Sequence, residues 1–346
     1  MPGEERGRRI LIVGPSWLGD AVMLGALTQR LKSGDPAGRI TVLTPAHLRD
    51  LVARLPGVDE TLVNPFAHGA LQLGARAGFG RALKGRFEAA VVLPHSWKSA
   101  LIPFFAGIGR RTGFVGEARY GVLTDARPLD AAVLPRMVDR FSLLAEPRGA
   151  LRPAQTPAPR LTADPVAIAA TLARLGLADG RPAIALCVGA EYGPAKRWPA
   201  AHFAALARRL ADAGYAAWAI GGPDDAPIGA EAAALAGGVL TDLTGKTTVA
   251  EAIDLIAAAS LTVSNDSGLM HVAAALGRPI VALYGSTSPA FTPPLSDDAV
   301  ILSLGLACSP CFERVCPLGH FNCLNQLSPD QVFAAVARRL PSPLVA

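Results

Sequence analysis

The first segment whose residues could do chemistry is a glycine-bearing loop with one carboxylate. Residues 14–20 read GPSWLGD and follow a short apolar run at residues 9–13. The glycines permit a tight turn and a close approach of a ligand to the main chain. The spacing is not that of a dinucleotide fingerprint, which needs a third glycine. Asp20 is predicted to lie at the start of a helix, where it could cap the helix or act as a general base, and both roles stay open.

A second segment combines glycines with two adjacent cations. Residues 189–199 read GAEYGPAKRWP and follow an apolar run at residues 183–188. Lys196 and Arg197, placed just before a predicted helix, suit a diphosphate. We expect Lys196 to bind phosphate and Trp198 to pack against the start of the helix.

A third segment, residues 264–271 with the sequence SNDSGLMH, is predicted to join a strand to a short helix. Ser267 and Gly268 open that helix, where main-chain N–H groups and the helix dipole form an anion site. Asp266 cannot itself attract phosphate, but it could hold sugar hydroxyls or cap the loop. His271 lies one helical turn further on, near the same face.

Four of the five cysteines fall within sixteen positions, with the spacing C-x2-C-x4-C-x6-C. In a cytosolic chain such a cluster favours a metal site over disulfides, and a zinc ion there would be structural. The spacing is not that of a zinc ribbon, so bound metal and free or paired thiols both stay open. Cys187, in an apolar run, is predicted to be buried. The predicted metal ligands are Cys308, Cys311, Cys316 and Cys323.

The elements that must position these residues alternate between strands and helices, which is typical of doubly wound α/β sheets. Residues 146–165 contain five prolines and few large apolar residues, which predicts a linker. We therefore expect two Rossmann-like domains, residues 1–155 and 165–327, followed by a helical segment in 328–346. Ligands in such sheets lie beyond the carboxyl ends of the strands, and an interdomain cleft is the expected site. Strands are predicted at residues 9–13, 40–43, 89–93, 183–188, 216–220, 261–264 and 279–284.

The charge is unevenly distributed along the 346 residues, whose net charge is +5. Residues 1–160 carry 22 Lys and Arg against 13 Asp and Glu, whereas the remainder carries 11 against 15. The first half is therefore expected to meet something anionic. Nucleic acid is disfavoured, because aromatic residues make up only 6% and do not interleave with basic ones. The absence of a signal-peptide segment predicts a cytoplasmic protein.

An ATPase is also excluded. The sequence GKT at residues 245–247 resembles the end of a phosphate loop, but Leu240 stands where that motif requires glycine.

Taken together, the three polar segments resemble glycosyltransferase family 9, the bacterial lipopolysaccharide heptosyltransferases, and within it the heptosyltransferase II subgroup. The similar stretches are residues 14–23, 189–199 and 265–276, continued through 283–285 and 291–295. The resemblance implies a GT-B fold, in which two Rossmann-like doubly wound domains face an interdomain cleft. It also implies that the last helix, within 328–346, crosses back to the N-terminal domain.

The resemblance implies roles for single residues. Asp20 is the candidate base that takes the acceptor hydroxyl proton, Lys196 would neutralise the diphosphate as ADP leaves, and Asp266 would hold heptose hydroxyls. No cofactor is required for catalysis, because a cation and a helix N-terminus can stabilise the leaving diphosphate. The other donor-binding candidates are Gly189, Ala190, Gly221, Gly222, Asp224, Thr247, Ser267, Gly268 and His271. The acceptor-binding candidates are Ser16, Trp17, His95, Lys98 and Arg119.

The implied reaction is an inverting transfer of L-glycero-D-manno-heptose from ADP-heptose to the inner-core heptose of Kdo–lipid A, in lipopolysaccharide core biosynthesis. The enzyme would work at the cytoplasmic face of the inner membrane, with its basic first half toward the phosphorylated lipid. Another nucleotide-sugar GT-B enzyme, such as an epimerase, and a non-catalytic binding protein of the same fold are the alternatives. Candidates for the basic surface are Arg76, Arg81, Lys84, Arg86, Lys98, Arg110, Arg111 and Arg119.

Overall fold

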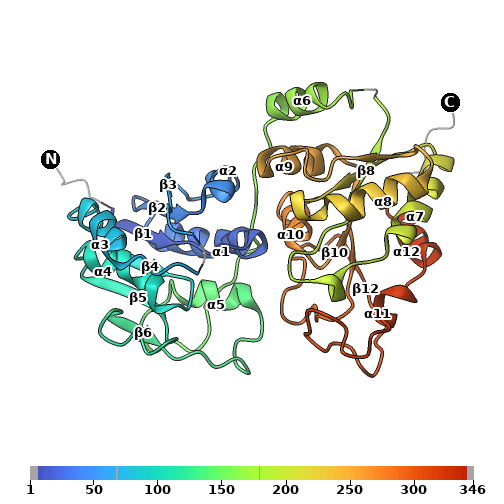
Figure 1. Ribbon diagram of the computed structural model, residues 1–346. Coiled ribbons are helices and arrows are strands. Elements are labelled where there is room, and N and C mark those ends of the chain that lie inside the picture. Colours follow the sequence, from blue (N-terminus) through green and yellow to red (C-terminus); the bar gives the residue numbers. More distant parts are fainter. Residues whose placement is uncertain (1–6, 68, 179, 341–346) are drawn as a thin grey trace. The chain divides into compact units, whose positions relative to one another are not determined.

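The computed structural model describes residues 7–67, 69–178 and 180–340 of the chain. It divides into two compact units, Met1–Leu161 and Thr162–Ala346. Figure 1 shows a sheet flanked by helices in each unit. The boundary between the units lies inside the proline-rich stretch that was predicted to be a linker.

The first unit is built on a parallel sheet with the strand order β3-β2-β1-β4-β5-β6, which is the order of Rossmann sheets. Its strands are β1 (Arg9–Val13), β2 (Arg39–Thr44), β3 (Glu60–Val63), β4 (Ala89–Val92), β5 (Arg110–Phe114) and β6 (Asp125–Arg127). Its helices are α1 (Leu18–Gly34), α2 (Arg49–Ala53), α3 (Leu73–Ala82), α4 (Leu101–Phe105) and α5 (Met137–Leu143).

The second unit repeats this topology with the order β12-β11-β10-β7-β8-β9, again all parallel. Its strands are β7 (Ala183–Cys187), β8 (Ala216–Ile220), β9 (Leu240–Asp242), β10 (Leu261–Asn265), β11 (Ile280–Leu283) and β12 (Ala299–Leu302). Its helices are α6 (Pro165–Arg174), α7 (Ala200–Asp212), α8 (Ala226–Ala236), α9 (Val249–Ala258), α10 (Gly268–Ala275), α11 (Asn322–Asn325) and α12 (Pro329–Ala337).

The central strands of the two sheets are largely apolar and buried. Every residue of β7, β8, β10 and β11 is buried, as expected for parallel strands that are covered on both faces. Each fully buried Val, Leu or Ile side chain contributes about 1.5–3 kcal/mol of transfer free energy. The cores therefore fix the strand ends from which the polar loops start.

All seven strands predicted from apolar runs are present, as β1, β2, β4, β7, β8, β10 and β11. Strand β5 was not predicted, because its sequence RRTGF begins with two arginines, yet four of its five residues are buried. The segment 328–346 that was predicted to be helical contains α12, which the Ser328 side chain caps and which begins at Pro329.

The buried face of α12 belongs to the core of the second unit, through Val332, Ala335 and Val336. The predicted crossing of segment 328–346 to the N-terminal domain stays a prediction, because residues 341–346 lie outside the described part of the chain.

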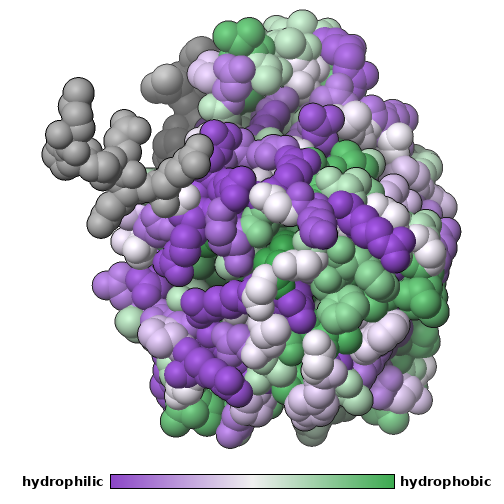
Figure 2. Space-filling view, turned by 90° about the vertical axis from the view of Figure 1, so that its left-hand side faces the viewer, coloured by the Kyte–Doolittle hydropathy of each residue, from purple (hydrophilic) through white to green (hydrophobic). Residues whose placement is uncertain are grey.

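Among the described residues, no helix is both long and apolar enough to span a membrane. On the face drawn in Figure 2, hydrophilic residues (purple) alternate with smaller hydrophobic patches (green).

Candidate functional site

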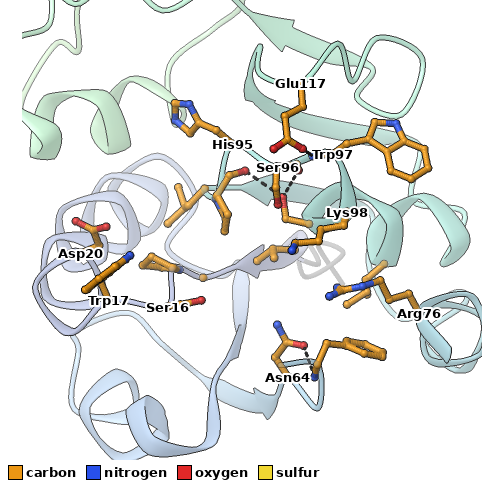
Figure 3. Close-up of a pocket in the computed structure, with 18 of the residues that line it drawn as sticks. Ser16, Trp17, Asp20, Asn64, Arg76, His95, Ser96, Trp97, Lys98 and Glu117 are labelled. Carbon is orange, nitrogen blue, oxygen red and sulfur yellow. Dashed lines mark hydrogen bonds between the residues drawn. The ribbon is translucent and has the colours of Figure 1, made fainter. Parts of the chain in front are cut away.

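A pocket of about 560 Å³ lies in the first unit, where the chain leaves β1 and β4. These two strands are neighbours at the centre of the sheet, and the strand order reverses between them, which is where Rossmann sheets bind ligands. The volume suits a small ligand such as one or two sugar rings. Figure 3 shows the polar side chains around the pocket. Its polar lining comprises Ser16, Trp17, Asp20, Asn64, Arg76, His95, Ser96, Trp97, Lys98, Ser99 and Glu117.

Three predicted residues reach this pocket from the segment after β1. Ser16 and Trp17 precede α1, and Trp17 rather than Asp20 occupies the N-cap position. Asp20 lies in the first turn of α1 and lines the pocket. The helix N-terminus stabilises the charge of the Asp20 carboxylate by roughly 0.3–1 kcal/mol, and its role as a general base stays a prediction.

The loop after β4 brings two further predicted residues, His95 and Lys98, to the same pocket. In Figure 3 the Lys98 amino group points into the pocket. Burial lowers the pKa of His95, and the nearby charges of Arg119 and Arg140 lower it further. The lowered pKa favours the neutral imidazole, which can both donate and accept hydrogen bonds.

Arg119 was predicted to bind an acceptor, and the structure contradicts this. Its side chain is fully buried and donates hydrogen bonds to the carbonyl oxygens of Phe114 (3.0 Å), Pro94 (2.6 Å) and Ser96 (3.2 Å). Burial lowers the pKa of Arg119 to about 10, so the group remains charged at pH 7. Arg119 thus fixes the loop that carries His95 by bonding to the carbonyl oxygens on either side of it.

Two other members of the predicted basic surface are also buried. Arg76 donates to the carbonyl oxygens of Leu71 (2.6 Å) and Ala70 (3.0 Å), and Arg111 donates to that of Val122 (2.6 Å). Long arginine side chains that satisfy main-chain carbonyls inside a fold cannot be distinguished from surface arginines by sequence. The exposed members of the set are Arg81, Lys84, Arg86 and Arg110.

In the second unit, Lys196 and Asp266 form a buried ion pair. The Lys196 Nζ lies 2.7 Å from Asp266 Oδ2, and the two side chains are 14% and 3% exposed. The Thr287 hydroxyl also donates to Asp266, and the Tyr192 ring lies 4.9 Å from Lys196 Nζ. The structure thus brings the predicted phosphate cation and the predicted sugar carboxylate into direct contact.

Asn265, to which the sequence assigned no role, holds this pair together. Its side-chain amide donates to the carbonyl oxygens of Val188 (2.9 Å) and Gly189 (3.2 Å) and accepts from the main-chain N–H of Trp198 (3.1 Å). The loop that carries Lys196 is therefore tied to the end of β10. The fully buried Trp198 packs at the start of α7, as predicted.

The N-terminus of α10 follows Asp266 directly. Ser267 is its N-cap, Gly268 its first residue, and no side chain caps the helix, so the N-terminal N–H groups are not claimed by a capping side chain. His271 is buried in the second turn, and burial lowers its pKa to about 4. His271 is therefore neutral at physiological pH and cannot act as a cation for phosphate.

The remaining predicted donor residues lie at the carboxyl ends of β8 and β9. The N–H of Gly245 donates to the carbonyl oxygen of Gly221 (3.0 Å), which joins the segment of Gly222 and Asp224 to that of Thr247. Gly189 and Ala190 begin the adjacent loop after β7. A Cβ at Gly189 would lie 2.0 Å from Asp225 Oδ2, so a larger residue there would displace the Asp225 carboxylate.

The four clustered cysteines line one small cavity, together with Ser286 and His320. They are free thiols, and within residues 7–67, 69–178 and 180–340 no group of three His, Cys, Asp or Glu side chains is arranged to hold a metal ion. A structural zinc at this position stays a prediction. Cys187 is fully buried in β7, as predicted.

These two sheets define a two-domain Rossmann-type protein with one candidate ligand site in each unit. Residues 76–322 match the family model of glycosyltransferase family 9 (heptosyltransferase). The chain is 43% identical to lipopolysaccharide heptosyltransferase 2 of Escherichia coli K12 over 334 residues. The matched region covers 94% of this chain and 96% of that protein. It is 45% identical over 306 residues to lipooligosaccharide heptosyltransferase 2 of Haemophilus influenzae, covering 85% and 88%.

Among solved structures, ADP-heptose LPS heptosyltransferase II of E. coli is similar, with a TM-score of 0.87 and 40% identity over 95% of this chain and 98% of that chain. The chain belongs to glycosyltransferase family 9, the heptosyltransferases. The predicted family, the GT-B fold class and the glycosyltransferase class of enzyme are confirmed.

Proposed function

We propose that this chain is an inverting glycosyltransferase that moves L-glycero-D-manno-heptose from ADP-heptose to the inner-core heptose of Kdo–lipid A during lipopolysaccharide core synthesis. The observation that carries the proposal is the similarity to heptosyltransferase 2 proteins over nearly the full length of the chain. The positions of Asp20, Lys196 and Asp266 in two ligand sites agree with it.

The second unit binds the donor in this proposal. The N–H groups at the start of α10 and the Lys196 ammonium face the diphosphate, and they stabilise the charge that ADP gains as it leaves. Asp266 accepts hydrogen bonds from heptose hydroxyls. The adenosine lies along the ends of β8 and β9, near Gly221, Gly222, Asp224 and Thr247.

The first unit binds the acceptor and supplies the base. The acceptor hydroxyl oxygen attacks the anomeric carbon of the heptose from the face opposite ADP, and its proton passes to the Asp20 carboxylate. The bond between the anomeric carbon and the phosphate oxygen breaks, and its electrons leave with ADP. Ser16, Trp17, His95 and Lys98 orient the acceptor, with Lys98 as the cation for an anionic group. This scheme needs no catalytic metal.

Because the proposed acceptor is linked to a lipid, we propose that the enzyme acts at the cytoplasmic face of the inner membrane. The exposed basic residues Arg81, Lys84, Arg86 and Arg110 support a peripheral contact with anionic lipid, to which each basic group near the surface contributes about 1 kcal/mol. Arg86 contributes less, because it already pairs with Glu60 at 3.1 Å. Co-sedimentation with anionic vesicles that weakens as salt is raised is the expected result.

The direct test is ADP release from ADP-heptose in the presence of mono-heptosylated Kdo2–lipid A. We expect transfer with ADP-heptose and none with UDP-sugars. Turnover of a UDP-sugar would instead indicate a different transferase or an epimerase. ADP binding without any transfer would indicate a non-catalytic binding protein.

The variant Asp20→Asn tests the base. It keeps the size and position of the side chain but cannot accept the proton, so transfer should fall by at least about a hundredfold while ADP affinity remains that of the wild type. Turnover close to wild type would refute the assignment of Asp20.

A further inference from the structure

The segment that holds the four clustered cysteines, residues 308–323 and here called the cysteine-rich segment, packs directly against the loop that carries Lys196. The main-chain N–H of Ala195 donates to the Arg314 carbonyl oxygen (3.0 Å), and the Tyr192 hydroxyl donates to that of Phe312. A Cβ at Gly193 would lie 2.5 Å from the Arg314 carbonyl oxygen, so the main chains of the two segments are in close contact there. The position of Arg314 is therefore fixed relative to Lys196.

Arg314 and Lys196 share one aromatic ring. The Arg314 guanidinium carbon lies 5.1 Å from the centre of the Tyr192 ring, and Lys196 Nζ lies 4.9 Å from it. These two distances together limit the separation of the two cationic groups to about 10 Å. Two cationic groups held around one ring lie within reach of the same anion.

The cationic side chains near the Tyr192 ring differ in whether a carboxylate neutralises them. Lys196 is neutralised by Asp266 at 2.7 Å, and Arg197 pairs with Asp225 at 3.7 Å. In the part of the chain that the structure describes, Arg314 is exposed and makes no ion pair. A diphosphate carries a negative charge on each phosphate, so Lys196, already paired, does not match it alone.

We propose that Arg314 is a second diphosphate ligand of the donor site, supplied by the cysteine-rich segment and oriented by Tyr192. The planar guanidinium binds two phosphate oxygens at once, while the Tyr192 ring contacts both cationic groups. This inference rests on the proposed function of the second unit. It assigns the cysteine-rich segment, which the reaction scheme otherwise leaves unused, to donor binding.

The test is calorimetric titration of the full-length protein with ADP and with adenosine. Arg314→Gln should raise the Kd for ADP by roughly tenfold or more, the loss expected for a charge-assisted hydrogen bond, and should leave the Kd for adenosine unchanged. The Kd of Arg314→Lys for ADP should lie between those of wild type and Arg314→Gln. Arg338→Gln removes another exposed arginine of the same unit and should leave both values within about twofold of wild type.

The contrast between the two ligands separates phosphate binding from a structural role. An equal loss of ADP and adenosine affinity, or an ADP affinity of Arg314→Gln within twofold of wild type, would overturn the assignment. If wild-type protein binds neither ligand, the donor site itself is wrong and the inference falls with it. If wild type and Arg314→Gln bind ADP equally, only the inference fails.

Discussion

Removing the Lys196 ammonium should destabilise the second unit far more than removing a lysine from a surface pair. Lys196 Nζ lies 2.7 Å from Asp266 Oδ2, and the Asp266 side chain is 3% exposed. The substitution Lys196→Met keeps most of the apolar stem and deletes the charge. It leaves a buried carboxylate to which the Thr287 hydroxyl still donates.

The magnitude follows from comparing two large opposing effects. At 2.7 Å and an effective dielectric constant of about 20, the Coulomb attraction is ~6 kcal/mol. The cost of removing both ions from water offsets most of it, so the pair as a whole contributes little net stability. Deleting one partner is different, because it strands the other charge at a cost of roughly 3–5 kcal/mol. With the Thr287 hydrogen bond retained, we expect Lys196→Met to lower the free energy of unfolding by about 2–3 kcal/mol.

A double substitution separates this stranded charge from a simple loss of packing. Lys196→Met/Asp266→Asn removes the charge that Lys196→Met strands, so its destabilisation should fall short of the sum of the two single variants by about 1–2 kcal/mol. Additive single effects would mean that the two side chains do not interact in solution.

The assay is urea unfolding followed by tryptophan fluorescence. Of the four tryptophans, Trp198 and Trp218 belong to the second unit, so a Trp17→Phe/Trp97→Phe background reports on that unit alone. The control is Lys246→Met, whose ammonium pairs with Asp242 at 3.5 Å while the side chain is 60% exposed. This control should lose no more than about 1 kcal/mol, and an equal loss in Lys196→Met would refute the reasoning.

Three further predictions follow from buried titratable groups. Arg119→Met removes the guanidinium donor from the carbonyl oxygens of Phe114, Pro94 and Ser96, of which the last two still accept from the Ser99 hydroxyl. It should cost the first unit about 2–3 kcal/mol, against under about 1 kcal/mol for the half-exposed Arg110→Met, both measured by urea unfolding. Burial holds the pKa of His271 at about 4, below the unfolded value of about 6.5. The unfolded chain therefore binds the proton first as pH falls through this window, and wild type should lose on the order of 3 kcal/mol that His271→Asn does not lose. Burial raises the pKa of Cys187 to about 12, whereas a main-chain hydrogen bond lowers the pKa of Cys316. With Ellman's reagent, Cys316 of the metal-free protein should therefore react first and Cys187 only after unfolding. The predicted zinc would protect the four clustered cysteines until a chelator is added.

The sheets were largely predictable from sequence, because a parallel strand covered on both faces must be an uninterrupted apolar run. Strands β7 and β8 satisfy this at every residue, whereas the equally buried β10, with the sequence LTVSN, includes three polar residues. Strand β5 escaped prediction because its arginines look like surface residues. Arg111 is nevertheless buried, since its guanidinium donates to main-chain carbonyl oxygens, and such a partner is visible only in the folded chain.

Charge was likewise a poor guide to which arginines meet a ligand. Arg119 and Lys98 both follow β4 or β5 and carry the same charge, yet one is fully buried and the other lines the pocket. The difference is the set of carbonyl oxygens around Arg119. The fold brings these together from residues 94, 96 and 114. No local pattern in the sequence encodes that convergence.

The donor site shows why residue types can be predicted while their contacts cannot. Lys196 and Asp266 are seventy positions apart, and each was identified from its own loop. Their pairing depends on Asn265, a fully buried amide whose donor and acceptor groups are both satisfied by the loop at residues 188–198. An amide at that depth without such partners would cost about 1–3 kcal/mol. The same hydrogen bonds that satisfy Asn265 therefore fix the loop against β10 and bring the lysine to the carboxylate.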